Sequence, residues 1–356
     1  MTARRLDEVR RRLSDRRLHA LVVTHLPHVQ YLTGFSGSHG VCVIRSDGQF
    51  FFSDGRYKSQ ALLETQGFRI VISAGSLFDA MHKKRAFAKN ERVGFESQYL
   101  TVSELHGLRR TFTGNTFVPT SLVIEEIAAV KDRAEIAAIK EAVSITDKVF
   151  EKLLDVVREG ITESEIAAEI SYLQRTSGAD ADAFEPIVAS GKRGAFPHAR
   201  ATQKKIQKGE MVTLDFGCRV KGYNSDLTRT ISVGRPSGEM RKIYEVVRQA
   251  QERAIASARS GLPAKSLDRV ARKHIVSQGY GKYFTHSLGH GLGHEVHELP
   301  RISRLSKDIL KENNVVTVEP GIYVPGTGGV RIEDDVVIRN GSCEVLNRSR
   351  KELVIV

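Results

Sequence analysis

Residues 211–234, MVTLDFGCRVKGYNSDLTRTISVG, contain the pattern that decides the fold of the C-terminal part of this chain. Asp215 closes an apolar run, a glycine-containing turn spans residues 217–222, and Asp226 begins a second run rich in Thr and Ile, which predicts a hairpin. The two carboxylates are eleven residues apart and can face each other on paired strands, where they would provide hard oxygen ligands. Both could instead be ordinary turn residues, but Asp215 lies in a run expected to be buried, where an unpaired carboxylate is costly.

A histidine cluster follows in residues 286–297, which contain four of the twelve histidines of the chain: His286, His290, His294 and His297. The first three are spaced by four residues, which on a helix would form one metal-binding face. The three glycines between them argue against a helix, because each glycine costs about 1 kcal/mol there. We therefore expect a strand and a tight glycine loop in which only some of these histidines reach a metal.

Two glutamates lie on late strands. Glu319 ends the apolar run VVTVEPG, and Glu333 lies in GGVRIEDDVVI, whose apolar residues mark a largely buried strand. With the two aspartates and one histidine they form an oxygen-rich set that suits one or two divalent ions such as Mn²⁺, Co²⁺ or Zn²⁺. Without a metal, four neighbouring buried carboxylates would repel one another and stay partly protonated.

The first part of the chain alternates between short strands and helices. HALVVTHL predicts a buried strand, Asp47-Gly48 predicts a hairpin, and the later strands are FRIVIS, RVGFES and TFVPT. Helical patterns separate them over residues 59–65, 77–88 and 103–110. About 120 residues of this kind predict a compact α/β domain with a mixed sheet.

The composition changes to a helical stretch rich in Ala, Glu and Lys near residues 122–132, where we place the domain boundary. The predicted domains are residues 1–125 and 126–356. The second domain should contain two helices, strands up to Gly234, two helices near residues 240–260 and 265–278, and strands to the end. This order suggests one α-α-β unit used twice.

Composition excludes several classes of protein. The 356 residues are 40% apolar and 27% charged, which excludes a mini-protein and argues against disorder. Three widely spaced cysteines without CxxC argue against a disulfide framework or a thiolate zinc site. The arginine-rich N-terminus lacks the apolar core of a signal peptide, and no run reaches the roughly 18 apolar residues of a membrane span. We expect a soluble cytoplasmic protein, whose net charge of +12 requires polyanion binding to be considered.

Five motifs, in this order, resemble the proline-specific metallopeptidases of the pita-bread fold, aminopeptidase P and prolidase. They are LDFG with Asp215, SDLTRT with Asp226, HSLGHGLGHEVHE with His290, TVEPGIY with Glu319 and VRIEDD with Glu333. YLTGF near Tyr31 and SDGRY near Asp54 are similar to the N-terminal domain of that family. The resemblance implies a creatinase/prolidase-type α/β domain with a mixed sheet, followed by an α+β pita-bread catalytic domain.

The resemblance also implies a dinuclear metal site. Asp215 would chelate one ion, His290 and Glu319 would bind the other, and Asp226 and Glu333 would bridge both. Divalent ions about 3.5 to 4 Å apart can share a water, lower its pKa and hold it as the attacking hydroxide. Glu319 would then carry a proton from this water toward the leaving nitrogen. Mn²⁺ is the expected ion, with Co²⁺ or Zn²⁺ as alternatives.

Three histidines match family positions that hold the peptide and stabilise the oxyanion: His198 in FPHARAT and His297 in EVHE as catalytic groups, and His286 in THSLGH as a substrate-binding group. Arg331 lies two residues before Glu333, so it points to the same face. It could orient a carboxylate or the substrate, or form a buried ion pair that supports the site.

Two further residues of this region each have two possible roles. Arg301 in HELPRIS is a candidate for binding a substrate carboxylate, or an ordinary surface arginine. His294 occupies a place where members of the family commonly carry an apolar residue. It is either an extra substrate contact or a solvated loop histidine.

The implied activity is the removal of an N-terminal residue before proline, or the cleavage of Xaa-Pro dipeptides. Aminopeptidase P and prolidase are not separated by these motifs. Methionine aminopeptidase fits less well because of the extra N-terminal domain, and creatinase because it lacks the ligand set. A non-catalytic member of the fold that binds nucleic acid or protein is the alternative, but such members generally lose the ligands. A homodimer is expected from the habit of the family, and no membrane association is expected.

Overall fold

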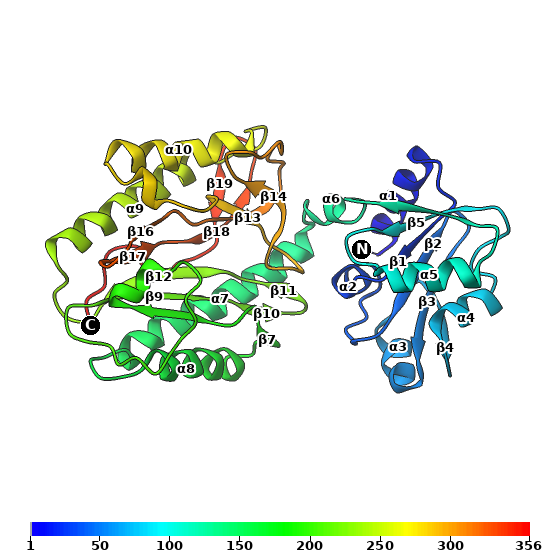
Figure 1. Ribbon diagram of the computed structural model, residues 1–356, viewed down its shortest axis with the longest axis horizontal. Coiled ribbons are helices and arrows are strands. Elements are labelled where there is room, and N and C mark those ends of the chain that lie inside the picture. The colour runs from blue at the N-terminus through cyan, green and yellow to red at the C-terminus, as the bar shows by residue number, and fades with distance from the viewer. Residues whose placement is uncertain (1) are drawn as a thin grey trace. The chain divides into compact units, whose positions relative to one another are not determined.

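The computed structural model describes residues 2–356; Met1, the first residue of the predicted N-terminal domain, lies outside them. The chain forms two compact units, Met1–Ala128 and Ala129–Val356, here called the N-terminal and C-terminal units (Figure 1). The boundary falls at the end of the short helix α6 (Glu125–Ala128).

The N-terminal unit is built on one six-stranded sheet in the order β4-β3-β2-β1-β5-β6. β1–β2 and β2–β3 are antiparallel, whereas the other three neighbouring pairs are parallel, so the predicted mixed sheet is confirmed. The strands are β1 (Ala20–Val23), β2 (Val41–Arg45), β3 (Gln49–Asp54), β4 (Arg69–Ser73), β5 (Arg92–Glu96) and β6 (Thr116–Thr120).

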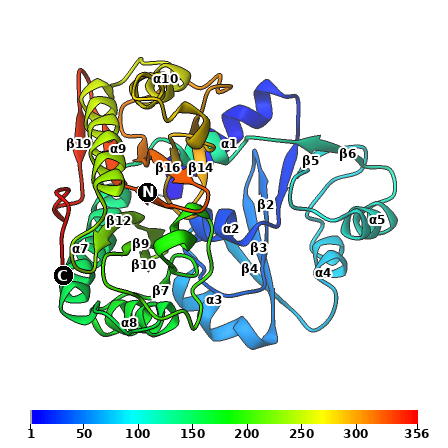
Figure 2. The same ribbon diagram turned by 60° about the vertical axis from the view of Figure 1, so that its left-hand side comes forward.

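Helices cover both faces of this sheet, because successive side chains of a strand point to opposite sides. In β1, Leu21 and Val23 pack with α1, α2 and α3, whereas Ala20 and Val22 pack with α4 and α5. Figure 2 shows α2 and α3 on one side of this sheet and α4 and α5 on the other. The helices are α1 (Thr2–Asp15), α2 (Leu26–Thr33), α3 (Lys58–Glu64), α4 (Leu77–Lys83) and α5 (Val102–Thr111), with a 3₁₀ turn at Gly55–Tyr57.

Two details of this unit differ from the sequence prediction. The segment predicted as a strand ends at Val23, and α2 begins at Leu26 with Pro27 in its first turn, where the missing N–H of proline costs nothing. Helix α4 ends at Lys83 and does not reach residue 88, because Arg85 adopts a left-handed φ of 50° that ends the helix.

The C-terminal unit contains two helix pairs, each followed by strands, in agreement with the predicted order. α7 packs on α8 and α9 packs on α10, and Figure 1 shows the strands between the two pairs. The helices are α7 (Arg133–Val156), α8 (Glu163–Thr176), α9 (Gly238–Ser257) and α10 (Ala264–Ser277), with 3₁₀ turns at Gly191–Ala195 and Gly281–Tyr283.

The strands of this unit form several short sheets, with orders β12-β9-β8, β11-β10-β7, β14-β13-β15-β18-β19 and β16-β17. Their bounds are β7 (Ala181–Asp182), β8 (Ile187–Ser190), β9 (Met211–Phe216), β10 (Cys218–Val220), β11 (Tyr223–Asn224), β12 (Leu227–Ser232), β13 (Gly289–Gly291), β14 (Glu298–Ile302), β15 (Val315–Val318), β16 (Gly321–Val324), β17 (Gly328–Arg331), β18 (Asp334–Ile338) and β19 (Cys343–Val345). One core packs α7 and α8 against β9 and β12, and another packs α9 and α10 against β15 to β18.

The predicted hairpin of residues 211–234 is present. β9 and β12 are antiparallel with Asp215 opposite Thr228, and Asp226 directly precedes β12. At the tip of the hairpin, Lys221 and Gly222 have φ values of 52° and 82°, which is the tight glycine turn expected there. Gly217 lies where the backbones cross, since a Cβ on it would be only 1.9 Å from the carbonyl oxygen of Ser225.

All three cysteines, Cys42, Cys218 and Cys343, are free thiols. Among residues 2–356, every helix is too short or too polar to cross a membrane.

We expect Gly217→Ala to lower the free energy of unfolding by at least about 1 to 3 kcal/mol. The new methyl group would meet the backbone of Ser225, which cannot move aside. Gly238→Ala is the matched control: it starts α9, meets nothing within 4 Å, and should change stability by less than about 1 kcal/mol. Urea unfolding of the two variants measures the difference. Equal midpoints would contradict the close approach at Gly217.

Candidate metal centre

The five predicted ligands come from five different places in the C-terminal unit. Asp215 lies near the end of β9, Asp226 directly before β12, His290 in the middle of β13, Glu319 directly after β15, and Glu333 between β17 and β18. The strands bring them together: Asp226, His290 and Glu333 each offer a ligand atom within 4.8 Å of the others. Glu319 joins them, with Oε1 3.5 Å from Nε2 of His290.

The imidazole of His290 is oriented as a metal ligand. Its Nδ1 lies 3.1 Å from the carbonyl oxygen of Gly291, which can only accept, so Nδ1 carries the proton. Nε2 then presents a lone pair toward Oδ2 of Asp226 at 3.8 Å and Oε1 of Glu319 at 3.5 Å. Burial lowers the pKa of His290 to about 4, so the ring is neutral near pH 7. These separations are too long for hydrogen bonds and leave room for a cation between the groups.

The carboxylates are crowded and buried. Asp215, Asp226 and Glu333 are 8%, 5% and 2% exposed. Burial, reinforced by the neighbouring carboxylates, raises the pKa of Asp226 and of Glu319 well above the usual range. Burial and the charge of Asp215 raise the pKa of Glu333 to about 8. Each carboxylate therefore disfavours ionisation of the others in the absence of a positive charge.

Two fully buried oxygens of this cluster have no hydrogen-bond partner among the described residues: Oδ1 of Asp215 and Oδ1 of Asp226. A buried oxygen without a partner is costly, and such groups call for an explanation. Hard oxygen donors together with one neutral imidazole are the ligand set of divalent ions such as Mn²⁺, Co²⁺ and Zn²⁺. The residues present therefore fit divalent metal ions.

Arg331 supplies the positive charge inside the cluster. Its guanidinium forms an ion pair with Oδ2 of Asp215, donates to Thr228 Oγ1 at 3.0 Å and to the hydroxyl of Tyr323 at 2.8 Å, and also reaches the carbonyl oxygen of Pro197 at 3.1 Å. The side chain is buried and uses its donors on protein oxygens. The sequence left two interpretations of Arg331, a group that orients a carboxylate or the substrate and a buried ion pair that supports the site. This geometry corresponds to the buried ion pair.

Thr228 and Tyr323 belong to this network, although sequence reasoning assigned neither of them a role. Thr228 donates through Oγ1 to Oε2 of Glu333 at 2.6 Å. Burial raises the pKa of Tyr323 to about 12, and its hydroxyl lies 2.9 Å from Nε2 of His286. Both residues lie within motifs that resemble the family, SDLTRT and TVEPGIY. Their place in these motifs was the sequence signal that could have identified them as site residues.

His286 has both ring nitrogens engaged. Nδ1 donates to the carbonyl oxygen of Ser287 at 2.7 Å, and Nε2 accepts from Tyr323. Burial, then the charge of Arg331, lowers the pKa of His286 to about 3, so the ring is neutral near pH 7. Oε2 of Glu319 is 4.0 Å from Nδ1. His286 is thus the end of a chain of hydrogen bonds that starts at Arg331.

His297 and His198 are exposed next to the buried cluster. The ring of His297 lies 4.3 Å from the ring of His290, centroid to centroid. Partial desolvation beside the ring of His290, then the charge of His198, lowers the pKa of His297. His198 follows Pro197, whose carbonyl oxygen accepts from Arg331, and it also contributes to the low pKa of His286. The structure therefore places all three predicted histidines around the ligands.

Arg301 and His294 lie farther out. Arg301 is exposed on β14, the neighbour of β13, and its charge contributes to the low pKa of His297. His294 is half-buried with its ring 4.2 Å from that of Tyr223, and its carbonyl oxygen accepts from Asn224 Nδ2 at 3.0 Å. His294 thus packs on Tyr223 and is partly shielded from solvent.

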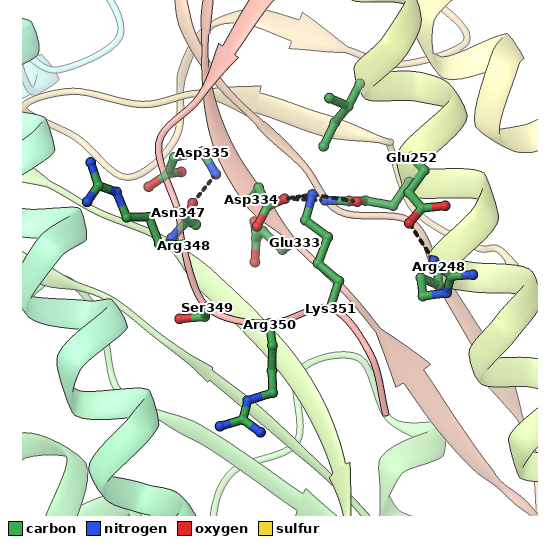
Figure 3. A network of polar contacts seen from close by, with 12 residues as sticks. Arg248, Glu252, Glu333, Asp334, Asp335, Asn347, Arg348, Ser349, Arg350 and Lys351 are labelled. Carbon is green, nitrogen blue, oxygen red and sulfur yellow. Dashed lines mark hydrogen bonds and ion pairs between the residues drawn. The ribbon is translucent and has the colours of Figure 1, made fainter. Parts of the chain in front are cut away.

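A second polar network holds the backbone behind the ligands. Asp335 of β18 accepts the N–H of Asp226 at 2.9 Å, and its own N–H donates to Asn347 Oδ1 at 2.7 Å. Asp334 pairs with Lys351 (Figure 3) and with Arg229, which is almost fully buried. The segment 347–351 near the C-terminus therefore ties β18 to β12 beside two of the ligands.

The raised carboxyl pKa values predict how the metal-free protein responds to pH. Between pH 6.5 and about 8, Glu333 keeps a proton in the folded state that the unfolded chain, with a pKa of 4.5, has released. The free energy of unfolding therefore falls as the pH rises through this window. His286 and His290 have lowered pKa values and act in the opposite direction, but only below pH 6.5.

We expect the melting temperature of the metal-free protein to fall between pH 6.5 and 8, and saturating Mn²⁺ to suppress most of that fall. Differential scanning calorimetry with and without chelator measures both. Glu333→Gln, whose side chain cannot titrate, is the control and should show a smaller fall of the metal-free melting temperature over this window. If the melting temperature of the metal-free protein rises between pH 6.5 and 8, the raised pKa values of the clustered carboxyl groups are contradicted.

Matches to known proteins cover both units of the chain. Residues 137–340 match Metallopeptidase family M24, and residues 5–130 match the Creatinase/Prolidase N-terminal domain. The chain is 41% identical over 351 residues to the uncharacterized peptidase YqhT of Bacillus subtilis (strain 168), with 99% of each covered. It is 36% identical over 337 residues to the Xaa-Pro dipeptidase of Pyrococcus horikoshii, with 94% of each covered.

Two solved structures are similar along nearly the whole chain. An Xaa-Pro dipeptidase from Bacillus anthracis has a TM-score of 0.97 at 38% identity, with 100% of both chains covered. An X-Pro aminopeptidase from Thermotoga maritima MSB8 has a TM-score of 0.89 at 36% identity, with 96% of this chain and 99% of that chain covered. The predicted two-domain fold and the family resemblance are therefore confirmed: this chain belongs to metallopeptidase family M24, with a creatinase/prolidase-type domain ahead of a pita-bread catalytic domain.

Proposed function

We propose that this protein is a metal-dependent exopeptidase that hydrolyses the Xaa-Pro bond, at the N-terminus of peptides or in dipeptides. The observation that carries the proposal is a cluster of four carboxylates, three of them buried, beside one neutral imidazole whose Nε2 lone pair faces Asp226 and Glu319. Relatives named Xaa-Pro dipeptidase and X-Pro aminopeptidase, at 36 to 38% identity along nearly the whole chain, support the choice of bond.

The five ligands would hold two divalent ions, with Asp226 and Glu333 shared between them. Asp215 would serve one ion, and His290 and Glu319 the other. When bound, such ions lower the pKa of a water and polarise the scissile carbonyl. Mn²⁺ as the resident ion and a homodimer as the assembly are parts of this proposal.

Glu319 is the proposed proton carrier. It lies at the edge of the cluster, and its backbone N–H is anchored to the carbonyl oxygen of Leu288 at 2.8 Å. The leaving nitrogen must receive a proton as the bond breaks, and the nitrogen of an Xaa-Pro bond is tertiary, with no N–H of its own before cleavage. A carboxylate at this position can take a proton from the attacking water and pass it to the nitrogen.

The histidines divide between support and substrate contact. His286 has both nitrogens bonded to the protein, so its proposed role is to fix Tyr323 at the edge of the site. His198 and His297 are exposed beside the cluster, where a peptide can reach them, and they are proposed to hold the substrate and stabilise the oxyanion. Arg331 is proposed to orient Asp215.

Asp226→Asn tests the metal site, because the amide keeps the shape but loses the charge that two ions would share. We expect metal binding to fall below two equivalents and kcat/KM to fall at least about 100-fold. Asp182→Asn is the matched control, since Asp182 is a half-buried aspartate of β7 that bonds to Ser171 and Gln174. Equilibrium dialysis and an Xaa-Pro hydrolysis assay provide the measurements. Full activity of Asp226→Asn would reject the proposed centre.

A matched pair of substrates separates the two activities. The metal-stripped protein, with Mn²⁺, Co²⁺ or Zn²⁺ added back, is assayed on an Xaa-Pro dipeptide and an Xaa-Pro-Yaa tripeptide. Cleavage of the dipeptide alone would identify a dipeptidase, and cleavage of the tripeptide an aminopeptidase. If the protein is a dipeptidase, Arg301 is the candidate for binding the carboxylate of the dipeptide. Arg301→Ala should then raise KM for the dipeptide about 10-fold or more and leave KM for the dipeptide amide, which lacks that carboxylate, unchanged. If no metal-loaded form of the protein hydrolyses either substrate, the proposed function is rejected.

A further inference from the structure

The loop that carries His198 begins and ends at one buried carboxylate. The loop runs from Ser190, the last residue of β8, through the 3₁₀ turn Gly191–Ala195 to Thr202. Glu163, the first residue of α8, lies beneath both of its ends and is 0% exposed. The proposed mechanism does not use Glu163, although a fully buried charge is expensive unless it is paired and hydrogen-bonded.

Each oxygen of this carboxylate serves one end of the loop. Oε1 accepts from the N–H of Ser190 at 2.8 Å and from its hydroxyl at 2.9 Å. Oε2 accepts from the N–H of Thr202 at 3.1 Å and from its hydroxyl at 2.8 Å. Arg193, inside the loop, adds an ion pair at 3.0 Å. The loop thus supplies five donors to a single anion, a number that no neutral side chain of this size could accept.

The same loop touches the metal centre. The carbonyl oxygen of Pro197 accepts from Nη1 of Arg331 at 3.1 Å, and Arg331 is paired with Asp215. At the base of the loop, Gly194 packs against Gly329 of β17, since a Cβ on Gly329 would be 2.0 Å from the carbonyl oxygen of Gly194. A displacement of the loop would therefore move His198 and remove one partner of Arg331.

We propose that Glu163 is a positioning residue: it closes residues 190–202 into a fixed loop, so that His198 and the Pro197 carbonyl are held beside the metal centre. This inference rests on the proposed function, in which His198 contacts the substrate. The alternative is that Glu163 only stabilises the start of α8, where a negative charge is favourable. A variant of Glu165 distinguishes these two roles. Glu165 lies in the same first turn of α8, but it bonds to Thr162 of the helix cap and not to the loop.

Glu163→Gln tests the proposal, with Glu165→Gln as the matched control. The glutamine keeps the shape, but its amide group turns donors toward Ser190 or Thr202 where acceptors are needed. We expect kcat/KM on the Xaa-Pro substrate to fall about 10- to 100-fold, with a rise in KM, because a small misplacement of a substrate-contacting group is costly. Glu165→Gln should match the wild type.

A double-mutant cycle shows whether Glu163 acts through His198. If it does, Glu163→Gln should have little further effect in a His198→Ala background. Additive effects, or a Glu163→Gln variant that loses melting temperature but keeps its KM and kcat, would overturn the proposal.

Limited proteolysis provides a readout that does not depend on activity. Lys192 and Arg200 are exposed trypsin sites inside the loop. Faster cleavage at these two sites in Glu163→Gln than in Glu165→Gln is expected, and equal rates would overturn the proposal. If the wild type cleaves no substrate, the proposed function fails, and the trypsin comparison alone decides whether Glu163 holds the loop. If Glu163→Gln does not fold, Thr202→Val, which removes one of the five donors, must show a smaller change in the same direction.

Discussion

Buried negative charge is the constraint on which the C-terminal unit depends. Burial and mutual repulsion raise the pKa values of Asp226, Glu319 and Glu333, and Arg331 offers a compensating charge to Asp215 inside the cluster. Such a cluster reaches low free energy only when protons or cations neutralise it. Cation binding and the stability of this unit are therefore two aspects of the same interaction.

The backbone around the ligands resists this repulsion. The N–H groups of Asp226, Glu319 and Glu333 are bonded to Asp335 Oδ2, Leu288 O and Thr228 O, at 2.9, 2.8 and 3.0 Å. These three acceptors are distant in the sequence from the groups that they bind, so the fold itself holds the backbone of these residues in place. Preorganisation of this kind keeps a metal site in its productive geometry when its charges are not yet balanced.

The carboxylates of the candidate metal centre could be singled out from the sequence because a carboxylate inside an apolar run is unusual enough to require a reason. The glycine-rich spacing around His290 likewise excluded the helix that regular histidine spacing alone would have favoured. Tyr323 was missed because a tyrosine in an apolar strand has the pattern of a core residue. Helix α2 was missed because its short apolar segment is ambiguous between strand and helix, and Pro27 in its first turn was the signal that could have decided it.

The sequence by itself determined the two-domain organisation, most of the order of helices and strands, and the residue types that gather at the candidate site. These depend on local periodicity and on residue types that have few other uses. Only the tertiary structure decided which groups meet: that Arg331 pairs with Asp215, that Tyr323 connects Arg331 to His286, and that Glu163 closes the loop of His198. These contacts join residues up to 116 positions apart, and their geometry depends on how strands pack and on the register of their pairing, which no local pattern encodes.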